Sequence, residues 1–247
     1  MATHFKGPIL FSAQRPALEN LNIARWNDQF IQFDDYDHGA IDETLRWVIV
    51  KDSGASVAIV ADARSGEVNL NSTATTENDG ASLQGHEEYF SLPSTAGDKL
   101  YYETRIKTSD VDQMDILVGL TETFATNPEN ALASSNIIGF LLADGSAVIS
   151  GVTESGDTAT VTTFSDTTKS TLADDTFVTL GFKATKGTST DTVRFYINRQ
   201  EVGASQTNIP TANLKLCAMS VSGTASGTQV TTLDYIMAAQ DRAVSYE

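Results

Sequence analysis

The chain has 247 residues, of which 40% are hydrophobic, and its 32 acidic and 16 basic residues give a formal net charge of −16. This length suits one large domain with a sizeable core. The negative charge repels a phosphate backbone, so no nucleic acid partner is expected. No apolar run approaches the ~20 residues that span a bilayer, so no membrane partner is expected either. Cys217 is the single cysteine, which leaves no disulfide bond within the chain.

Residues 1–25 are predicted to form an extended N-terminal arm, because prolines and glycine interrupt any regular element there. Apolar side chains nevertheless recur along this segment, and such side chains need a surface to lie against. Two alternatives stay open: the arm packs along its own domain, or it clasps a neighbouring subunit. The candidate interface residues of the arm are Phe5, Ile9, Leu10 and Phe11.

Residues 26–42 mix aromatic and acidic side chains. Asp34, Asp35 and Asp37 are candidate ligands for a glycan or a calcium ion, since calcium sites use several carboxylates on a loop. The spacing of an EF-hand loop is absent, however. Acidic residues are also common on turns for reasons of turn chemistry alone. We therefore expect no resident metal ion and no cofactor.

From residue 45 onward the chain reads as a series of short strands separated by turn-forming residues such as Asp144-Gly145. The clearest pair spans residues 99–121, where apolar and polar side chains alternate with a period of two. A helical turn is expected at residues 128–134, which begin with proline. The predicted strands are 45–50, 57–61, 67–71, 81–84, 88–92, 99–108, 114–121, 137–143, 147–152, 158–164, 176–184, 192–198, 201–204, 214–221 and 229–238.

Many short strands with almost no helix predict an all-β sandwich or barrel. No change in composition divides the strand-rich region, so a single domain is expected. The predicted organisation is an arm over residues 1–25, an antiparallel sandwich over 26–240 and a short C-terminal tail over 241–247.

Three stretches carry a resemblance to a known fold: the strand pair at 99–121, the segment IIGFLLAD ending at Asp144, and the hairpin at 177–202. Their order resembles the concanavalin A-like jelly roll, a two-sheet antiparallel sandwich shared by legume lectins, laminin G-like domains and many glycan-active enzymes. The resemblance implies the fold more strongly than any one activity.

The whole chain also resembles structural proteins of tailed bacteriophages. The resemblance rests on the motif HFKGPILF at residues 4–11, the aspartate-rich segment followed by Trp47, and NDGASLQ at 78–84. It implies a non-enzymatic protein that binds the outside of a capsid and stabilises it. The implied partners are the major capsid protein and, in a homotrimer, further copies of the chain. The implied location is the virion surface, after synthesis in the host cytoplasm.

Two other functions compete with this interpretation. Glycoside hydrolysis needs two carboxylates beside the scissile bond. One large glucanase family of this fold carries Glu, Asp and Glu along one strand, and the comparable residues 113–118 contain Asp115 but no glutamate. The sequence therefore predicts no enzyme. The alternative function is a lectin-like module that attaches to a polysaccharide.

Overall fold

The computed structural model describes residues 29–37, 39–61, 63, 66–72, 76–124, 127–223 and 228–241. The arm candidates Phe5, Ile9, Leu10 and Phe11, and tail residues 242–247, lie outside the described residues. No helix in the described ranges is long and apolar enough to cross a membrane.

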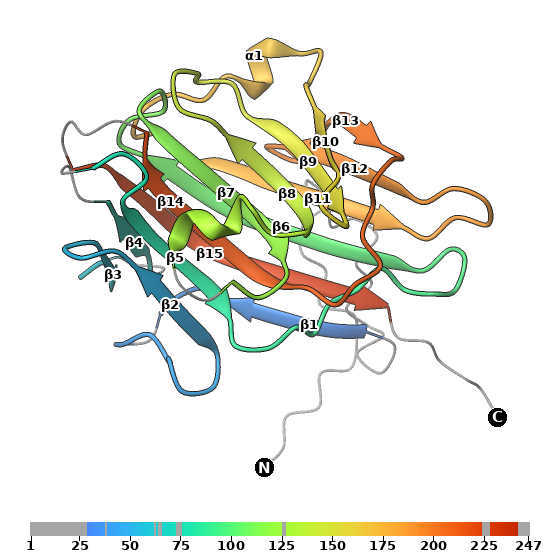
Figure 1. The fold of residues 1–247 in the computed structure, drawn as a ribbon, viewed down its shortest axis with the longest axis horizontal. Helices are drawn as coiled ribbons and strands as arrows, with labels where there is room; N and C mark the ends of the chain where they lie inside the picture. Colours follow the sequence, from blue (N-terminus) through green and yellow to red (C-terminus); the bar gives the residue numbers. More distant parts are fainter. Residues whose placement is uncertain are drawn as a thin grey trace, which may run out of the picture.

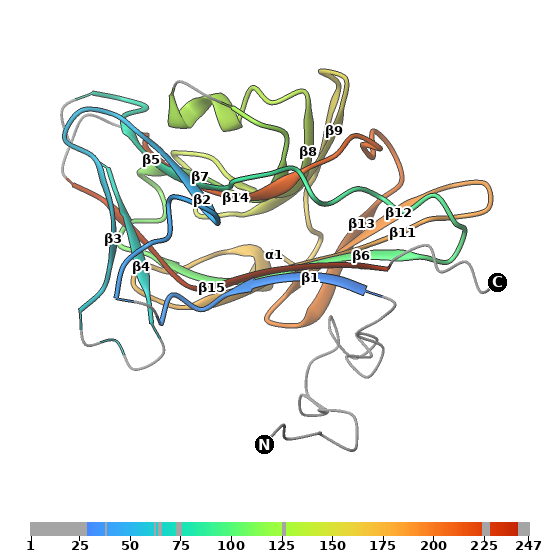
Figure 2. The ribbon, with the colours of Figure 1, turned by 90° about the horizontal axis from the view of Figure 1, so that it is seen from below.

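The described chain forms two stacked antiparallel sheets (Figures 1 and 2). Sheet A has the strand order β13-β12-β11-β6-β15-β4-β3, with β1 paired to the second half of β15. Sheet B has the order β10-β9-β8-β7-β14-β5-β2. The predicted fold class, an antiparallel two-sheet jelly-roll sandwich, is confirmed.

The strands have the following bounds. Sheet A contains β1 (Gln29–Asp34), β3 (Ser56–Ile59), β4 (Val68–Asn71), β6 (Lys99–Thr108), β11 (Val178–Thr185), β12 (Thr192–Ile197), β13 (Gln200–Ser205) and β15 (Val230–Asp241). Sheet B contains β2 (Trp47–Lys51), β5 (Gly80–Gly85), β7 (Met114–Thr121), β8 (Asn136–Leu142), β9 (Ser150–Ser155), β10 (Ala159–Thr162) and β14 (Lys215–Ser222).

The core lies between the inner faces of the two sheets, as the alternation along β6 predicts. Leu100, Tyr102 and Ile106 are buried there. Tyr101, Glu103 and Arg105 alternate with them and point to the outer face of sheet A. Aromatic rings meet across the layers: the Phe140 ring of sheet B packs edge-on against the Phe195 ring of sheet A, with 5.4 Å between centroids. Such packing accounts for the sandwich without help from any disulfide bond.

A second apolar cluster covers the outer face of sheet B. Ile137 and Leu141 of β8 point outward and pack with Phe124 and Ala131, which belong to the connection between β7 and β8. This connection contains the short 3-10 helix η2 (Pro128–Ala131), the green coil in front of sheet B in Figure 1. The chain's own connection therefore covers part of the outer face of sheet B, and η2 lies mainly against β14 and β5.

Four local predictions need correction. The strand pair predicted at residues 99–121 does not form a hairpin, because β6 pairs within sheet A and β7 within sheet B. Residues 88–92 do not form a strand, because only Phe90 pairs, in an isolated bridge with Leu214. Strand β1 was not predicted, since apolar side chains occupy both of its faces and hide the period of two: Phe30 packs inward on Phe90, whereas Phe33 points outward. The strand expected at 147–152 begins later, and a helical turn α1 (Thr167–Ser170) follows β10.

Candidate functional site

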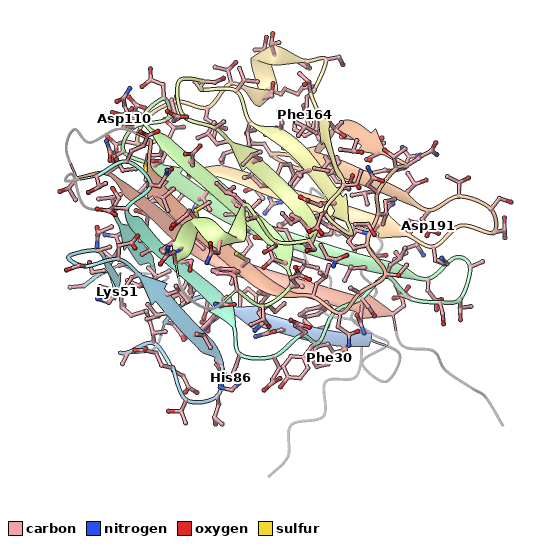
Figure 3. All side chains as sticks on the ribbon, in the orientation of Figure 1. Phe30, Lys51, His86, Asp110, Phe164 and Asp191 are labelled. Carbon is pink, nitrogen blue, oxygen red and sulfur yellow. The ribbon has the colours of Figure 1, made fainter. Side chains whose placement is uncertain are left out.

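A polar pocket of about 390 Å³ lies at one end of the sandwich. Three segments meet there: the β9–β10 turn, the β11–β12 loop and the residues that follow β13. Figure 3 labels Asp191 on the β11–β12 loop at this end. The lining residues are Ser155, Thr158, Ser189, Thr190, Asp191, Gln206, Asn208 and Ile209.

Tight turns position the two sides of the pocket. In the β9–β10 turn, Gly156 and Asp157 have φ values of 57° and 61°, the left-handed conformations of a two-residue hairpin turn. The Ser155 backbone N–H donates to the Thr158 carbonyl at 3.2 Å across this turn. On the other side, the Asn208 side-chain amide donates to the Thr160 hydroxyl at 2.9 Å. The turns therefore fix the wall residues relative to β10.

One carboxylate lines the pocket, and the protein already binds both of its oxygens. Asp191 accepts a hydrogen bond from the Lys186 ammonium at 3.0 Å and another from the Gly187 backbone N–H at 3.0 Å. The remaining lining groups are hydroxyls and amides, with Ile209 as the single apolar member. Hydroxyls both donate and accept hydrogen bonds, as do side-chain amides, so the pocket suits a polyhydroxylated ligand better than an apolar one.

A pair of carboxylates, Asp115 and Asp144, lies at the opposite end of the sandwich from the pocket. Asp115 begins β7 on the outer face of sheet B, and the Asp144 backbone N–H donates to its Oδ1 at 3.0 Å. Burial raises the pKa of Asp115, and the negative charges of Asp144 and Glu77 raise it further. A carboxyl group that keeps its proton to higher pH beside a second carboxylate is the arrangement that acid–base chemistry uses.

The three aspartates of the predicted glycan or calcium loop differ in how deeply they are buried. Asp34 is buried, and its two oxygens accept hydrogen bonds from the Trp47 indole N–H at 2.7 Å and the Tyr36 backbone N–H at 2.9 Å. Asp35 is partly buried and Asp37 is exposed. Among the described residues, no three His, Cys, Asp or Glu side chains are grouped so that they could hold a metal ion. Asp34 thus has a structural role, and the ligand role of the three aspartates stays a prediction.

Sequence reasoning missed the pocket and half of the carboxylate pair. The pocket residues come from three separate turns, and no spacing in the sequence signals that the turns converge. The sequence analysis did not pair Asp144 with Asp115. The signal that brings them together is the pairing of β7 with β8, in which Ile116 lies opposite Leu142.

Acidification is expected to stabilise this protein. Burial is the largest cause of the raised pKa values of Asp52, Asp110, Asp115 and Glu154, whereas Asp166 alone among the described acids shows a lowered pKa. A raised folded-state pKa adds stability that is fully present below about pH 4 and is lost as the pH rises through the folded value. Urea unfolding should therefore show a higher midpoint at pH 5 than at pH 7.5, and an equal or lower midpoint at pH 5 would contradict this.

No protein-family model and no curated protein matches the chain in sequence. Solved structures do match it in three dimensions. An endo-1,3-β-glucanase from Streptomyces sioyaensis superposes with a TM-score of 0.59 at 10% identity, over 87% of this chain and 98% of that one. A lichenase from a mouse hindgut metagenome gives 0.55 at 14% identity, over 87% and 99%. An endo-β-1,4-glucuronan lyase from Trichoderma reesei gives 0.54 at 10% identity, over 84% and 94%.

These likenesses contradict the expected function and the expected absence of enzymatic activity. The prediction was a non-enzymatic protein that stabilises a capsid, whereas the similar structures are glycoside hydrolases and a lyase. The phage-like motifs at residues 4–11 and 78–84 were too short to carry that inference. The expected capsid partner, the expected homotrimer and the expected virion location stay predictions. In its architecture the chain has a concanavalin A-like jelly roll of the type found in β-glucan-cleaving enzymes.

Proposed function

We propose that this protein is carbohydrate-active and binds a polysaccharide in the polar pocket at the end of the sandwich. The observation that carries the proposal is the pocket lining, in which hydroxyl and amide side chains surround one carboxylate. The similar solved structures add support, because they include enzymes that act on β-glucans and on a glucuronan. The lectin-like alternative of the sequence analysis agrees with this pocket, although the loop residues first considered for it lie elsewhere.

The pocket has the exposed groups that sugar recognition needs. Ser189, Thr190 and Gln206 are exposed, so their polar groups can exchange water for sugar hydroxyls without unfolding any element. Gln206 also donates to the Thr192 hydroxyl at 3.3 Å, a long bond that a ligand hydroxyl can replace. Both oxygens of Asp191 accept hydrogen bonds within the β11–β12 loop. We therefore assign Asp191 to holding this loop in position, and the exposed hydroxyl and amide groups to contact with the ligand.

Removal of two rim groups should weaken glycan binding. In the Thr190→Val, Gln206→Ala double variant, we expect at least about tenfold weaker binding, since two hydrogen-bonding side chains are lost. The measurement is affinity electrophoresis in gels that contain β-1,3-glucan, mixed-linkage β-glucan or polyglucuronate. Thr168→Val on helix α1 makes a similar change at an exposed site outside the pocket lining and should leave the mobility shift unchanged. Equal retardation of the double variant and the wild type would remove the pocket from the proposal.

A second candidate function, glycoside cleavage, is favoured by the Asp115–Asp144 pair. The raised pKa of Asp115 suits a general acid, and Asp144 offers the second carboxylate that hydrolysis needs. This candidate is independent of the pocket, because the two sites lie at opposite ends of the molecule. The middle of the outer face of sheet B offers no comparable chemistry in the described residues: Leu117, Gly119, Ile137 and Gly139 point outward there.

A further inference from the structure

Basic residues gather on the outer face of sheet A, although the chain as a whole is strongly acidic. Of the bases in the described ranges, six belong to this face, five on its strands and one in the β12–β13 turn: Lys99, Arg105, Lys107, Lys183, Arg194 and Arg199. Four of the six are paired with an acid, namely Arg105 with Asp234, Lys107 with Glu67, Arg194 with Glu201 and Arg199 with Glu103. Lys99 and Lys183 form no ion pair with any residue in the described ranges.

The base cluster, defined as Lys99, Lys183 and Arg194, places like charges side by side on neighbouring strands. Lys183 on β11 lies directly opposite Arg194 on β12, and like charges in opposite positions destabilise a sheet. Lys99 lies in the next outward-facing row, two pairs further along the strands, where Thr185 pairs with both Lys99 and Thr192. Burial lowers the pKa of Lys183, and the charges of Arg194 and Lys99 lower it further. Glu201 pairs with Arg194 and offsets part of this repulsion, but no acid in the described ranges pairs with Lys183. A like-charge pair that is kept in spite of its cost indicates a site with a function beyond folding.

The base cluster is continuous with the polar pocket. Gln206 lines the pocket and donates to Thr192, which belongs to the same cross-strand row as Thr185 and Lys99. Lys183 and Arg194 occupy the next outward-facing row. A chain-like ligand that leaves the pocket past Gln206 would therefore meet the bases in succession.

We propose that the base cluster selects an anionic polysaccharide, a polyuronate, whose sugar carboxylates pair with Lys99, Lys183 and Arg194 while the neighbouring residues enter the pocket. Charge complementarity carries this choice of ligand. Within the described ranges, two cations of the cluster have no acid partner, on a chain whose net charge is −16. Carboxylates spaced along a polymer satisfy several cations at once, and the sugar hydroxyls between them match the polar rim. The proposal rests on the proposed function, because it names the class of glycan for that pocket.

The test compares an oligoglucuronate with a neutral β-1,4-glucan oligosaccharide of equal length, by calorimetric titration of the full chain at low and high salt. We expect the oligoglucuronate to bind at least about tenfold more tightly at low salt, and this preference to fall as sodium chloride screens the charges. The Lys183→Gln, Arg194→Gln double variant should lose the preference and keep its affinity for the neutral sugar. Lys183→Arg keeps the charge and should keep the preference.

The matched control is Lys169→Gln on helix α1, which removes the same charge from an ion pair with Asp166 elsewhere on the surface and should change neither affinity. The thermal midpoint of Lys183→Gln should equal or exceed that of the wild type, because a repulsive pair has been removed. An undiminished preference in the double variant, or equal affinity for both sugars, overturns the inference and leaves the proposed function standing. Absence of binding to either sugar overturns the proposed function as well. A fall in oligomer mass in the double variant, without any effect on sugars, would assign the cluster to contact with a second copy of the chain.

Discussion

Replacement of Asp34 by alanine is expected to lower the free energy of unfolding by about 2–4 kcal/mol, because two buried donors lose their acceptor. One donor is the Trp47 indole N–H at 2.7 Å, and the other is the Tyr36 backbone N–H at 2.9 Å. Trp47 and Tyr36 are themselves buried, at 1% and 2% exposure, so water cannot replace the lost acceptor. The measurement is urea unfolding followed by tryptophan fluorescence.

The backbone near Asp34 adds to this loss. Tyr36 has a φ of 53°, a left-handed conformation that bulky residues rarely adopt, and the Asp34 carboxylate holds it through the bond to its N–H. Gly66 lies directly against this turn, since a Cβ at Gly66 would stand 2.4 Å from the Tyr36 carbonyl oxygen. Without the carboxylate, this unfavourable backbone conformation loses the hydrogen bond that holds it, and the contact with Gly66 is disturbed as well.

Two variants separate the structural role of Asp34 from a ligand role. Asp37→Ala removes an exposed carboxylate one position after Tyr36, and it should lower the free energy of unfolding by no more than about 1 kcal/mol, the usual limit for an exposed polar interaction. Asp34→Asn keeps one acceptor oxygen, and its loss of unfolding free energy should lie between the losses of Asp34→Ala and Asp37→Ala. A chelator should leave the wild-type unfolding curve unchanged if Asp34 acts only within the protein. A large loss of stability on chelation, or in Asp37→Ala, would instead support a calcium ion held by the loop.

The strands that could be predicted from sequence are those whose two faces differ in polarity. In β6, Leu100 and Tyr102 alternate with Lys99 and Tyr101, and the period of two identified both the strand and its buried face. In β1 that signal fails, because Phe30 is packed inward while Phe33 is apolar and outward. The pattern therefore identifies a difference in polarity between the two faces, and it gives no signal where both faces carry apolar side chains.

The candidate sites were less predictable than the strands because they depend on which turns converge. Asp115 could be placed on an outward face from its strand alone, but its partner Asp144 becomes a neighbour only through the pairing of β7 with β8. The pocket needs the position of Asn208 relative to Thr160, 48 residues apart in sequence. Short polar residues on turns serve mainly to make turns, so their identity does not distinguish a binding rim from an ordinary loop.

Replacement of Asp115 by asparagine is expected to lower the rate of glycan cleavage at least about 100-fold, because the asparagine amide has no acidic proton to give to the leaving group. The assay measures the reducing ends released from β-1,3-glucan and mixed-linkage β-glucan. Asp144→Asn should lower the rate to a similar extent, since hydrolysis needs both carboxylates. Asp112→Asn removes an exposed carboxylate at the same end of the sandwich and should leave the rate unchanged.

The pH dependence of the same assay gives an independent test of the role of Asp115. A general acid works in its protonated form, so the rate should fall as the pH rises through the pKa of Asp115, which burial and the charge of Asp144 hold above that of an ordinary aspartate. In Asp144→Gln one of the charges that raise this pKa is gone, and any residual activity should lose its alkaline limb at lower pH. A wild-type protein that releases no reducing ends from either glucan, or an Asp115→Asn variant that cleaves at the wild-type rate, would refute cleavage at this pair. Glycan binding in the pocket would remain, because no residue of the pair lines it.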